Sequence, residues 1–269
     1  MKKYTFKMLA LATLTCVLVS CQKEGIESDT DISAAQSVAD VESTFDDASD
    51  QALFCLAETQ PSTSGCPTVT YAQPVGTYPN TVTLDYGTGC TAANGRVRSG
   101  QIVVQVTGSY TTPGMVRTIT PVNFAVNDWT LEGTRTVTNL GNNESSQMQW
   151  SVEVENAKLT QPGGDFATWN ALRTRTLIAG AETDGCEDDV YQITGGSSGV
   201  SFRGVAVTAT IVTPITKATN CRWPQSGVRE VQSENRNQPR RLDYGPGECD
   251  DQATLTLPNG QVRPITLRR

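Results

Sequence analysis

The chemistry open to this chain is limited first by composition, because none of its 269 residues is a histidine. Histidine is the commonest general base and the commonest metal ligand, so Ser-His-Asp and Cys-His arrangements and His-ligated metal sites are excluded. Carboxylates remain, and two of them facing each other roughly 5–10 Å apart can hydrolyse a glycosidic bond. No motif identifies such a pair. We therefore expect a non-enzymatic protein, with a carboxylate-dependent, glycosidase-like hydrolase acting on envelope or host glycans as the alternative.

Two acidic clusters adjoin cysteines and offer oxygen ligands. The cluster beside Cys186 consists of Asp184, Glu187, Asp188 and Asp189. The cluster beside Cys249 consists of Glu248, Asp250 and Asp251. Clustered carboxylates suit Ca²⁺, but neither cluster has the spacing of a known calcium loop. We interpret both as charged turns and expect no metal or other cofactor, the first cluster being a weak calcium candidate.

Tryptophans and arginines could form a binding surface. Trp150 alternates with apolar residues and is expected in the core, whereas Trp129 and Trp169 lie near turns and could stack on a glycan. Five arginines lie in alternating segments: Arg117, Arg135, Arg173, Arg175 and Arg203. We expect them on the outward faces of strands, beside threonines and acids. The alternative is an arginine-lined concave face that binds anionic glycans or lipids.

The first 24 residues predict a lipid modification. Lysines precede an apolar run of about a dozen residues, which is too short to span a bilayer comfortably. Residues 18–21, LVSC, resemble a bacterial lipobox. We therefore predict a lipoprotein signal peptide at residues 1–20, cut before Cys21, whose sulfur then carries the lipid and whose new N-terminus is acylated, for example with palmitate. More than one acyl chain makes such anchoring stable.

Charge is distributed unevenly along the mature chain. Residues 22–60 carry one lysine and ten acids, a net charge of −9, whereas residues 61–269 carry 17 basic and 18 acidic residues, a net charge of −1. An acidic arm is repelled by anionic headgroups and would hold the body off the membrane. No basic stripe with interleaved aromatic residues is present, so nucleic acid is not an expected partner.

Six cysteines remain after the signal peptide and Cys21 are set aside, and an internal repeat suggests how they pair. LDYGTGC at 84–90 and LDYGPGEC at 242–249 each follow an upstream cysteine and precede an Asn-Gly turn. We predict the disulfides Cys66–Cys90 and Cys221–Cys249, with Cys55–Cys186 by elimination. The alternative is free buried thiols. We interpret the repeated Leu-Asp-Tyr-Gly as scaffold, with leucine and tyrosine on one face and a turn or bulge at glycine.

The elements that position these residues follow from periodicity. Residues 21–31 are polar and acidic and predict a tether. From Ile32, apolar residues recur every three or four positions and predict an amphipathic helix at about 33–57, within segment 32–60. We expect it to cover the core; the alternative is a partner-binding helix. Residues 61–269 alternate with period two and predict a mainly β domain of roughly ten to thirteen antiparallel strands. The expected architecture is a long meander sheet that is curved, sandwich-like or an open barrel.

The segments 78–90, 94–104, 123–127 and 131–139, together with LDYG at 242–245, resemble a family of uncharacterised lipoproteins of bacteroidete-type bacteria. The resemblance covers most of the mature chain and implies a β fold and a location, but no catalytic residue. Residues 22–24, QKE, are similar to the signal that sends such lipoproteins to the outer face of the outer membrane. The expected location is therefore the outer membrane, lipid-anchored and at the cell surface, with a periplasm-facing anchor as the alternative. The expected partners are the membrane, through Cys21, and a glycan or protein ligand.

Overall fold

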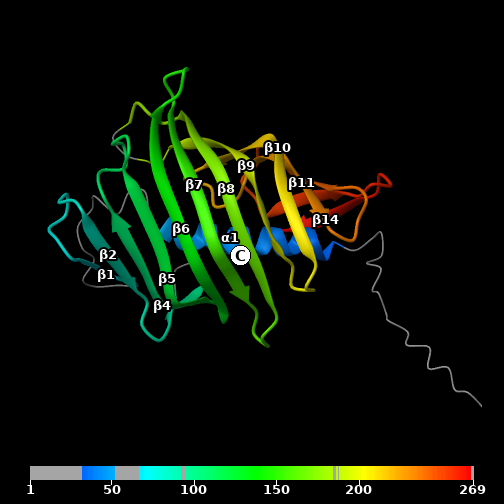
Figure 1. Ribbon diagram of the computed structural model, residues 1–269, viewed down its shortest axis with the longest axis horizontal. Helices are drawn as coiled ribbons and strands as arrows, with labels where there is room; N and C mark the ends of the chain where they lie inside the picture. Colours follow the sequence, from blue (N-terminus) through cyan, green and yellow to red (C-terminus); the bar gives the residue numbers. More distant parts are fainter. Residues whose placement is uncertain (1–31, 52–66, 92–94, 184–185, 187, 268–269) are drawn as a thin grey trace, which may run out of the picture.

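The computed structural model of the chain describes residues 32–51, 67–91, 95–183, 186 and 188–267 (Figure 1). The predicted signal peptide, the lipidation site Cys21, the tether and residues 52–57 of the predicted helix lie outside these ranges. So do Cys55, Cys66, Asp184 and Glu187. Predictions that fall on these residues therefore remain predictions.

One helix and fourteen strands make up the described chain. They are α1 (Ser33–Gln51), β1 (Thr68–Tyr71), β2 (Asn80–Asp85), β3 (Cys90–Thr91), β4 (Val97–Val106), β5 (Val116–Val126), β6 (Trp129–Asn142), β7 (Met148–Thr160), β8 (Phe166–Ala179), β9 (Val190–Val200), β10 (Ala206–Ala218), β11 (Ser226–Ser233), β12 (Arg240–Pro246), β13 (Gln252–Thr256) and β14 (Val262–Thr266).

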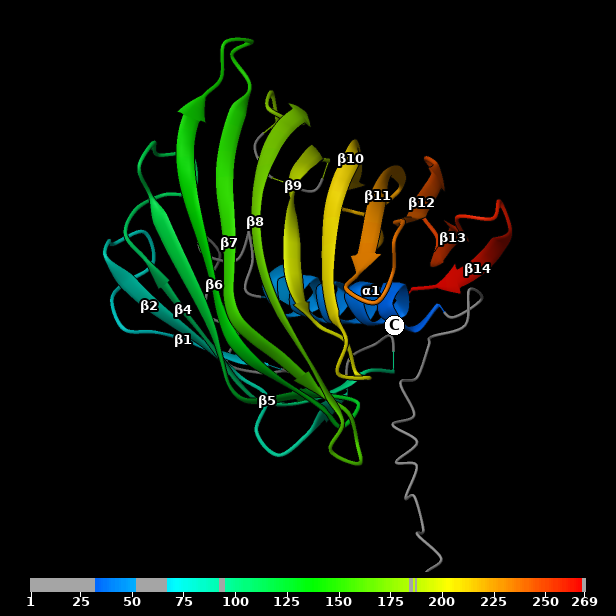
Figure 2. The ribbon, with the colours of Figure 1, turned by 45° about the vertical axis from the view of Figure 1, so that its right-hand side comes forward.

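All fourteen strands belong to one antiparallel sheet. The hydrogen-bonded order is β1-β2-β4-β5-β6-β7-β8-β9-β10-β11-β12-β13-β14, and β3 pairs with β4 beside this path. The sheet is therefore a meander with β1 and β14 as its edges, and it is not closed. It is strongly curved, and α1 lies on its concave side and runs across the strands (Figures 1 and 2). The mainly β, antiparallel meander predicted from the period-two pattern is confirmed, in its curved and open form.

Helix α1 covers the core, as its apolar stripe predicts. Its first half packs Ala35 and Val38 against the core side chains of β10 to β14. Its second half packs Val41, Phe45 and Ala48 against those of β1 to β8. One amphipathic helix thus links two hydrophobic clusters that the width of the sheet keeps apart. Within the described residues, no helix is both long enough and apolar enough to cross a membrane.

Glycines in β9 let the backbone of the neighbouring strand β8 approach closely. Added Cβ atoms would lie 2.4 Å from the carbonyl oxygen of Leu172 at Gly195 and 1.9 Å from that of Thr168 at Gly199. Ser197 and Gly199 line a narrow gap beneath the helix. Glycine is therefore required where the backbones of β8 and β9 approach closely. As a result, β9 has no large side chain on either face between residues 195 and 199.

The two copies of the repeat have the same local structure, as predicted. Leu84 and Tyr86 are buried in β2 and just after it, and Leu242 and Tyr244 are buried in β12. Asp85 accepts a hydrogen bond at 2.7 Å from the amide of the glycine two residues on, and Asp243 does so at 2.9 Å. Both of these glycines have positive φ. The motif therefore forms the same aspartate-stabilised turn at two distant places in the sheet.

The disulfide Cys221–Cys249 is present, as the repeat predicts, and it joins the β10–β11 connection to the β12–β13 connection. Cys90 and Cys186 are also disulfide-bonded. The partners predicted for them, Cys66 and Cys55, lie outside the described residues, so those two pairings remain predictions.

Candidate functional site

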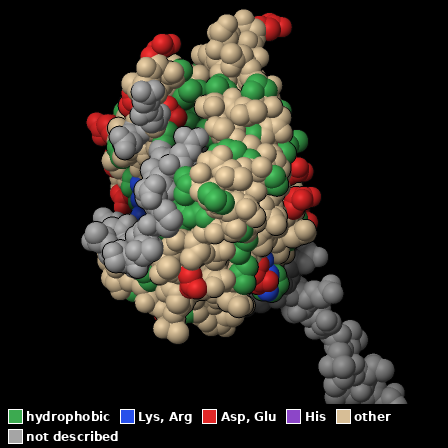
Figure 3. Space-filling model, turned by 90° about the vertical axis from the view of Figure 1, so that its left-hand side faces the viewer, with side chains coloured by type: hydrophobic (Ala, Val, Ile, Leu, Met, Phe, Trp, Pro, Cys, Tyr) green, Lys and Arg blue, Asp and Glu red, His purple; other side chains and the backbone are tan. Residues whose placement is uncertain are grey.

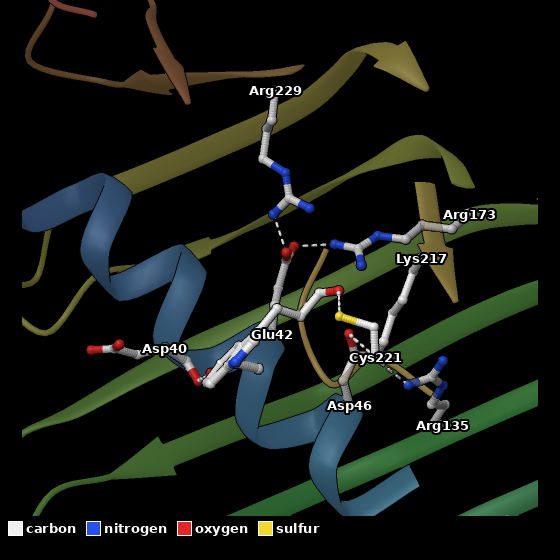
Figure 4. A network of polar contacts seen from close by, with 10 residues as sticks. Asp40, Glu42, Asp46, Arg135, Arg173, Lys217, Cys221 and Arg229 are labelled. Atoms are coloured by element: carbon white, nitrogen blue, oxygen red, sulfur yellow. Dashed lines mark hydrogen bonds and ion pairs between the residues drawn. The ribbon is translucent and has the colours of Figure 1, made fainter. Parts of the chain in front are cut away.

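Two carboxylates of α1, Glu42 and Asp46, lie one turn apart and point at the sheet (Figure 4). Each oxygen of Glu42 accepts a hydrogen bond from a different arginine. Arg173 of β8 binds Oε1 and Arg229 of β11 binds Oε2. The side chains of Glu42, Arg173 and Arg229 are 7%, 10% and 3% exposed, so this three-membered ion pair is removed from water.

Asp46 makes a second set of ion pairs one helical turn further along. Its Oδ1 accepts a hydrogen bond from Nη1 of Arg135 at 3.0 Å, and its Oδ2 lies 3.6 Å from Nζ of Lys217. Burial alone would raise the pKa of the Asp46 carboxyl, but Lys217, Arg135 and Arg173 together hold that pKa below its usual range. The helix is thus joined by charge to β6, β8, β10 and β11.

The inward position of these arginines corrects the expectation from sequence. Arg117, Arg135 and Arg175 are buried, and of the five arginines expected on outward faces only Arg203 is exposed. In the space-filling view from the β1 and β2 side, Lys and Arg atoms are accordingly rare on the described surface (Figure 3). The outward assignment was wrong because the partners are distant in sequence. The partners of these arginines are carboxylates of α1 and aromatic rings on other elements.

Two arginines lie over aromatic rings at one end of the concave face. The guanidinium carbon of Arg175 lies 3.6 Å from the ring centroid of Tyr191, and that of Arg117 lies 5.0 Å from that of Tyr110. Tyr110 stacks on Trp150 with centroids 4.6 Å apart. Trp150 is fully buried, as expected from its place in the alternation. Cation–π contacts of this kind stabilise a desolvated guanidinium.

The space between α1 and the sheet contains two adjoining cavities of about 30 and 20 Å³, both bordered by Asp46, Arg173 and Lys217. We call the two together the charged pocket. Its described cationic lining residues are Arg135, Arg173, Arg175, Lys217, Arg222 and Arg229, and its acidic ones are Glu42 and Asp46. Arrangements of this kind bind anions.

Tyr244 lines the larger cavity and makes the stability of the protein sensitive to alkali. Burial, opposed by Arg229 and reinforced by Glu42, raises the pKa of Tyr244 from 10.0 to about 12. The unfolded chain therefore ionises first, and stability that is complete below pH 10 should fall as the pH rises to 12. The expected loss by pH 12 is about 2 kcal/mol, because the folded state is by then half ionised.

The measurement is urea unfolding at several pH values between 9 and 12. Tyr244→Phe, which has no ionisable group at this position, should lose less stability than the wild type over this range, by the amount assigned to Tyr244. Equal losses in the two proteins would contradict the assignment.

The two tryptophans proposed as a glycan platform do not share an exposed surface. Trp169 is 4% exposed and packs against Phe45 of α1, so the expectation that it is exposed was wrong. Trp169 lies two residues from the buried Ala167 and from the buried Ala171, so all three share the inward face of β8. Trp129 is half-buried and meets Phe202 edge to face, with centroids 5.6 Å apart.

The acidic clusters agree only in part with the expected solvated turns, because Asp188 is exposed whereas Asp189 is buried. Asp188 is exposed and accepts a hydrogen bond from Thr183 Oγ1 at 2.7 Å. Asp189 is buried and accepts one from the Tyr191 hydroxyl at 2.6 Å. Asp250 accepts one from the amide of Gln252. Within the described ranges, no three Cys, Asp or Glu side chains are grouped so that they could hold a metal ion.

The convex face carries a second candidate site, which sequence reasoning missed. A shallow hollow of about 550 Å³ lies over β7 to β10. Its floor is the small-residue stretch of β9, and its rims carry Glu153, Glu155, Asn170 and Leu172 on one side and Thr208 and Thr210 on the other. We call it the convex hollow. The signal in the sequence was the run GGSSG at 195–199, whose absent or short side chains leave the depression.

The fold and the sites define a protein with one open, curved β-sheet. A helix lies on the concave face, where buried ion pairs hold it, and a polar hollow lies on the convex face. Comparisons with protein-family models, with curated proteins and with solved structures found no match to this chain.

Proposed function

We propose that this chain is a lipid-anchored, non-catalytic binding protein of the outer membrane, presented at the cell surface, which binds a glycan in the convex hollow. The anchor is Cys21, and α1 begins twelve residues later, at Ser33. That length of chain reaches at most about 40 Å. The anchor would therefore keep the body within reach of the membrane, while the acids between Cys21 and α1, repelled by anionic headgroups, would hold it off the surface.

The single observation that carries the ligand assignment is the lining of the convex hollow. Its volume of about 550 Å³ falls in the range of small-molecule sites, roughly 300–1,000 Å³. The carboxylates of Glu153 and Glu155 accept hydrogen bonds, and the threonine hydroxyls both donate and accept. The Asn170 side chain can donate through Nδ2, while its Oδ1 accepts a hydrogen bond from the Asn156 amide at 2.8 Å. Leu172 is 62% exposed and offers an apolar contact for the C–H face of a sugar ring. This mixture suits a polyhydroxylated ligand.

The same hollow contains two carboxylates, Glu153 and Glu155, whereas the hydrolase alternative needs a pair that face each other. Glu153 and Glu155 are two residues apart on one face of β7, so their Cα atoms are separated by about 7 Å along the strand. They lie side by side on an open surface and do not face each other across a cleft. A glycosidase needs one carboxyl on each side of the scissile bond, and this placement therefore favours binding over hydrolysis.

Glycan binding is tested with a glycan array followed by calorimetry on the soluble domain. Replacing both Asn170 and Leu172 by alanine should weaken binding of the best array ligand at least tenfold, a loss of about 1.4 kcal/mol. Thr254→Ala, on the outward face of β13 and outside the hollow, is the matched control and should bind as the wild type does.

Two results would count against this function. One is a glycan array with no binder, and the other is a double variant that binds as well as the wild type. Release of reducing ends from a bound polysaccharide, lost in Glu153→Gln, would replace the binding proposal by the hydrolase alternative.

A further inference from the structure

The convex hollow is negatively charged, and its charge limits the glycans that it can bind. Among the described residues that line it, Glu153 and Glu155 are the only charged ones. We infer that the convex hollow selects a cationic glycan, an oligomer of amino sugars with protonated amines, over the N-acetylated oligomer of the same sugar. This inference rests on the proposed function, because it names the class of glycan that the same site binds.

The first support is that the two glutamates have no partner within the protein. Four other acidic residues lie in the described strands, and each accepts a hydrogen bond or forms an ion pair: Asp85, Glu132, Glu230 and Asp243. Glu153 and Glu155 form neither with any residue in the described part of the chain. They are therefore the two strand carboxylates that remain available to a ligand.

The second support is that the cross-strand neighbours of the two glutamates are uncharged. Glu153 lies between Thr136 of β6 and Leu172 of β8, and Glu155 lies opposite Thr134 of β6. An opposite charge at any of these positions would stabilise the sheet. The two carboxylates instead share one face of β7, two residues apart, where like charges repel. A bound cation would reduce this repulsion.

The cationic side chains of the surrounding strands are engaged elsewhere. None of those described in β7 to β10 lines the hollow. Three of them lie on the concave face, against carboxylates of α1 or an aromatic ring: Arg173, Arg175 and Lys217. The fourth, Lys158, pairs with Glu132 at 3.2 Å and lies 5.0 Å from the ring centroid of Phe166. The negative charge of the hollow is therefore left to attract a cationic ligand.

The remaining lining residues distinguish an amino sugar from other cations. Within the described ranges, no third acidic or cysteine side chain joins the two glutamates to form a metal site. The hydroxyls of Thr208 and Thr210 can bind sugar hydroxyls, and the exposed Leu172 offers an apolar contact. A glucosamine ring presents hydroxyl groups, an apolar C–H face and an ammonium group, and it matches all three features. A lysine-rich peptide supplies the charge without the hydroxyl groups.

The test is calorimetry with a glucosamine hexamer and an N-acetylglucosamine hexamer, which differ only in the acetylation of their amino groups. The protein is the full mature chain carrying Cys21→Ser, which removes the predicted lipid attachment. The pH is about 6, where amino groups carry a proton. We expect the glucosamine hexamer to bind at least about fivefold more tightly, the effect of two exposed ion pairs. Added sodium chloride should reduce this preference, because salt screens exposed charges.

The variant that tests the assignment combines Glu153→Gln with Glu155→Gln. Its affinity for the glucosamine hexamer should fall about fivefold or more, whereas its affinity for the acetylated hexamer should change less than about twofold. Glu132→Gln combined with Glu144→Gln is the matched control. It removes the same amount of charge from exposed positions outside the hollow and should keep the preference.

Four outcomes would overturn the inference: no binding of the glucosamine hexamer, equal affinity for the two hexamers, a preference that survives in the Glu153/Glu155 variant, or tighter binding of hexalysine than of the glucosamine hexamer. The glycan array separates these outcomes from failure of the proposed function. An array glycan whose binding depends on Asn170 and Leu172 would keep the hollow as a glycan site of another class. An array without a binder would overturn both.

Discussion

Glu42→Gln is expected to destabilise the protein by about 3–5 kcal/mol, the usual consequence of removing one partner from a buried ion pair. Glutamine keeps the shape of the side chain but removes the charge that compensates Arg173 and Arg229. Both guanidinium groups would then remain buried without their carboxylate. The measurement is urea unfolding followed by circular dichroism at neutral pH.

A matched control exists on the outside of the sheet. Glu132 pairs with Lys158 at 3.2 Å, and the two side chains are 61% and 38% exposed. Glu132→Gln should cost less than about 1 kcal/mol, because exposed ion pairs contribute little. Adding Arg229→Met to Glu42→Gln should restore part of the lost stability, since it removes one uncompensated charge. A Glu42→Gln variant as stable as the Glu132→Gln control would contradict the role given to this network.

Removing the Cys221–Cys249 disulfide is expected to cost about 3–4 kcal/mol. The bond closes a loop between cysteines 28 residues apart, and the estimate follows from the chain entropy that such a closure removes from the unfolded state. Cys221 is buried, so alanine is the suitable replacement there, with serine at Cys249. Thermal and urea unfolding of the double variant against the wild type provide the measurement.

Peptide mapping without reduction is the companion experiment. A peptide that joins Cys221 to Cys249 is expected in the wild type and should be absent from the double variant. A Cys90–Cys249 peptide would contradict both the repeat argument and the observed bond. Peptides joining Cys66 to Cys90 and Cys55 to Cys186 would confirm the two pairings that remain predictions.

Much of the fold could be predicted from local patterns. The alternation in segments such as 148–154 indicated antiparallel strands, and the spacing of Ala35, Val38, Val41 and Phe45 indicated a helix that covers a core. Both signals arise within a few residues, from the geometry of a strand or of a helical turn. The Leu-Asp-Tyr-Gly repeat likewise predicted equal turns and one disulfide, because equal sequence in equal context gives equal local structure.

The face on which the arginines lie was assigned wrongly, although the information was present. Trp169 and Ala171 share the parity of Arg173 and Arg175 in β8, so a buried Trp169 places both arginines inward. Sequence reasoning treated charge as a mark of the solvent face, because isolated charges avoid burial. No pattern near the arginines in the sequence indicated that α1 would bring carboxylates to them.

The sequence by itself determined the elements of this protein: one amphipathic helix, a long antiparallel meander, and a repeated turn tied by a disulfide. Tertiary structure alone decided which side of the sheet became the interior. Glu42 is 131 residues from Arg173 and 187 from Arg229, and these partners meet only because the sheet curves around α1. A buried charge is strongly destabilising unless an opposite charge lies beside it. The contact between Glu42 and its two arginines depends on the curvature and register of many strands, so no local pattern in the sequence predicts it.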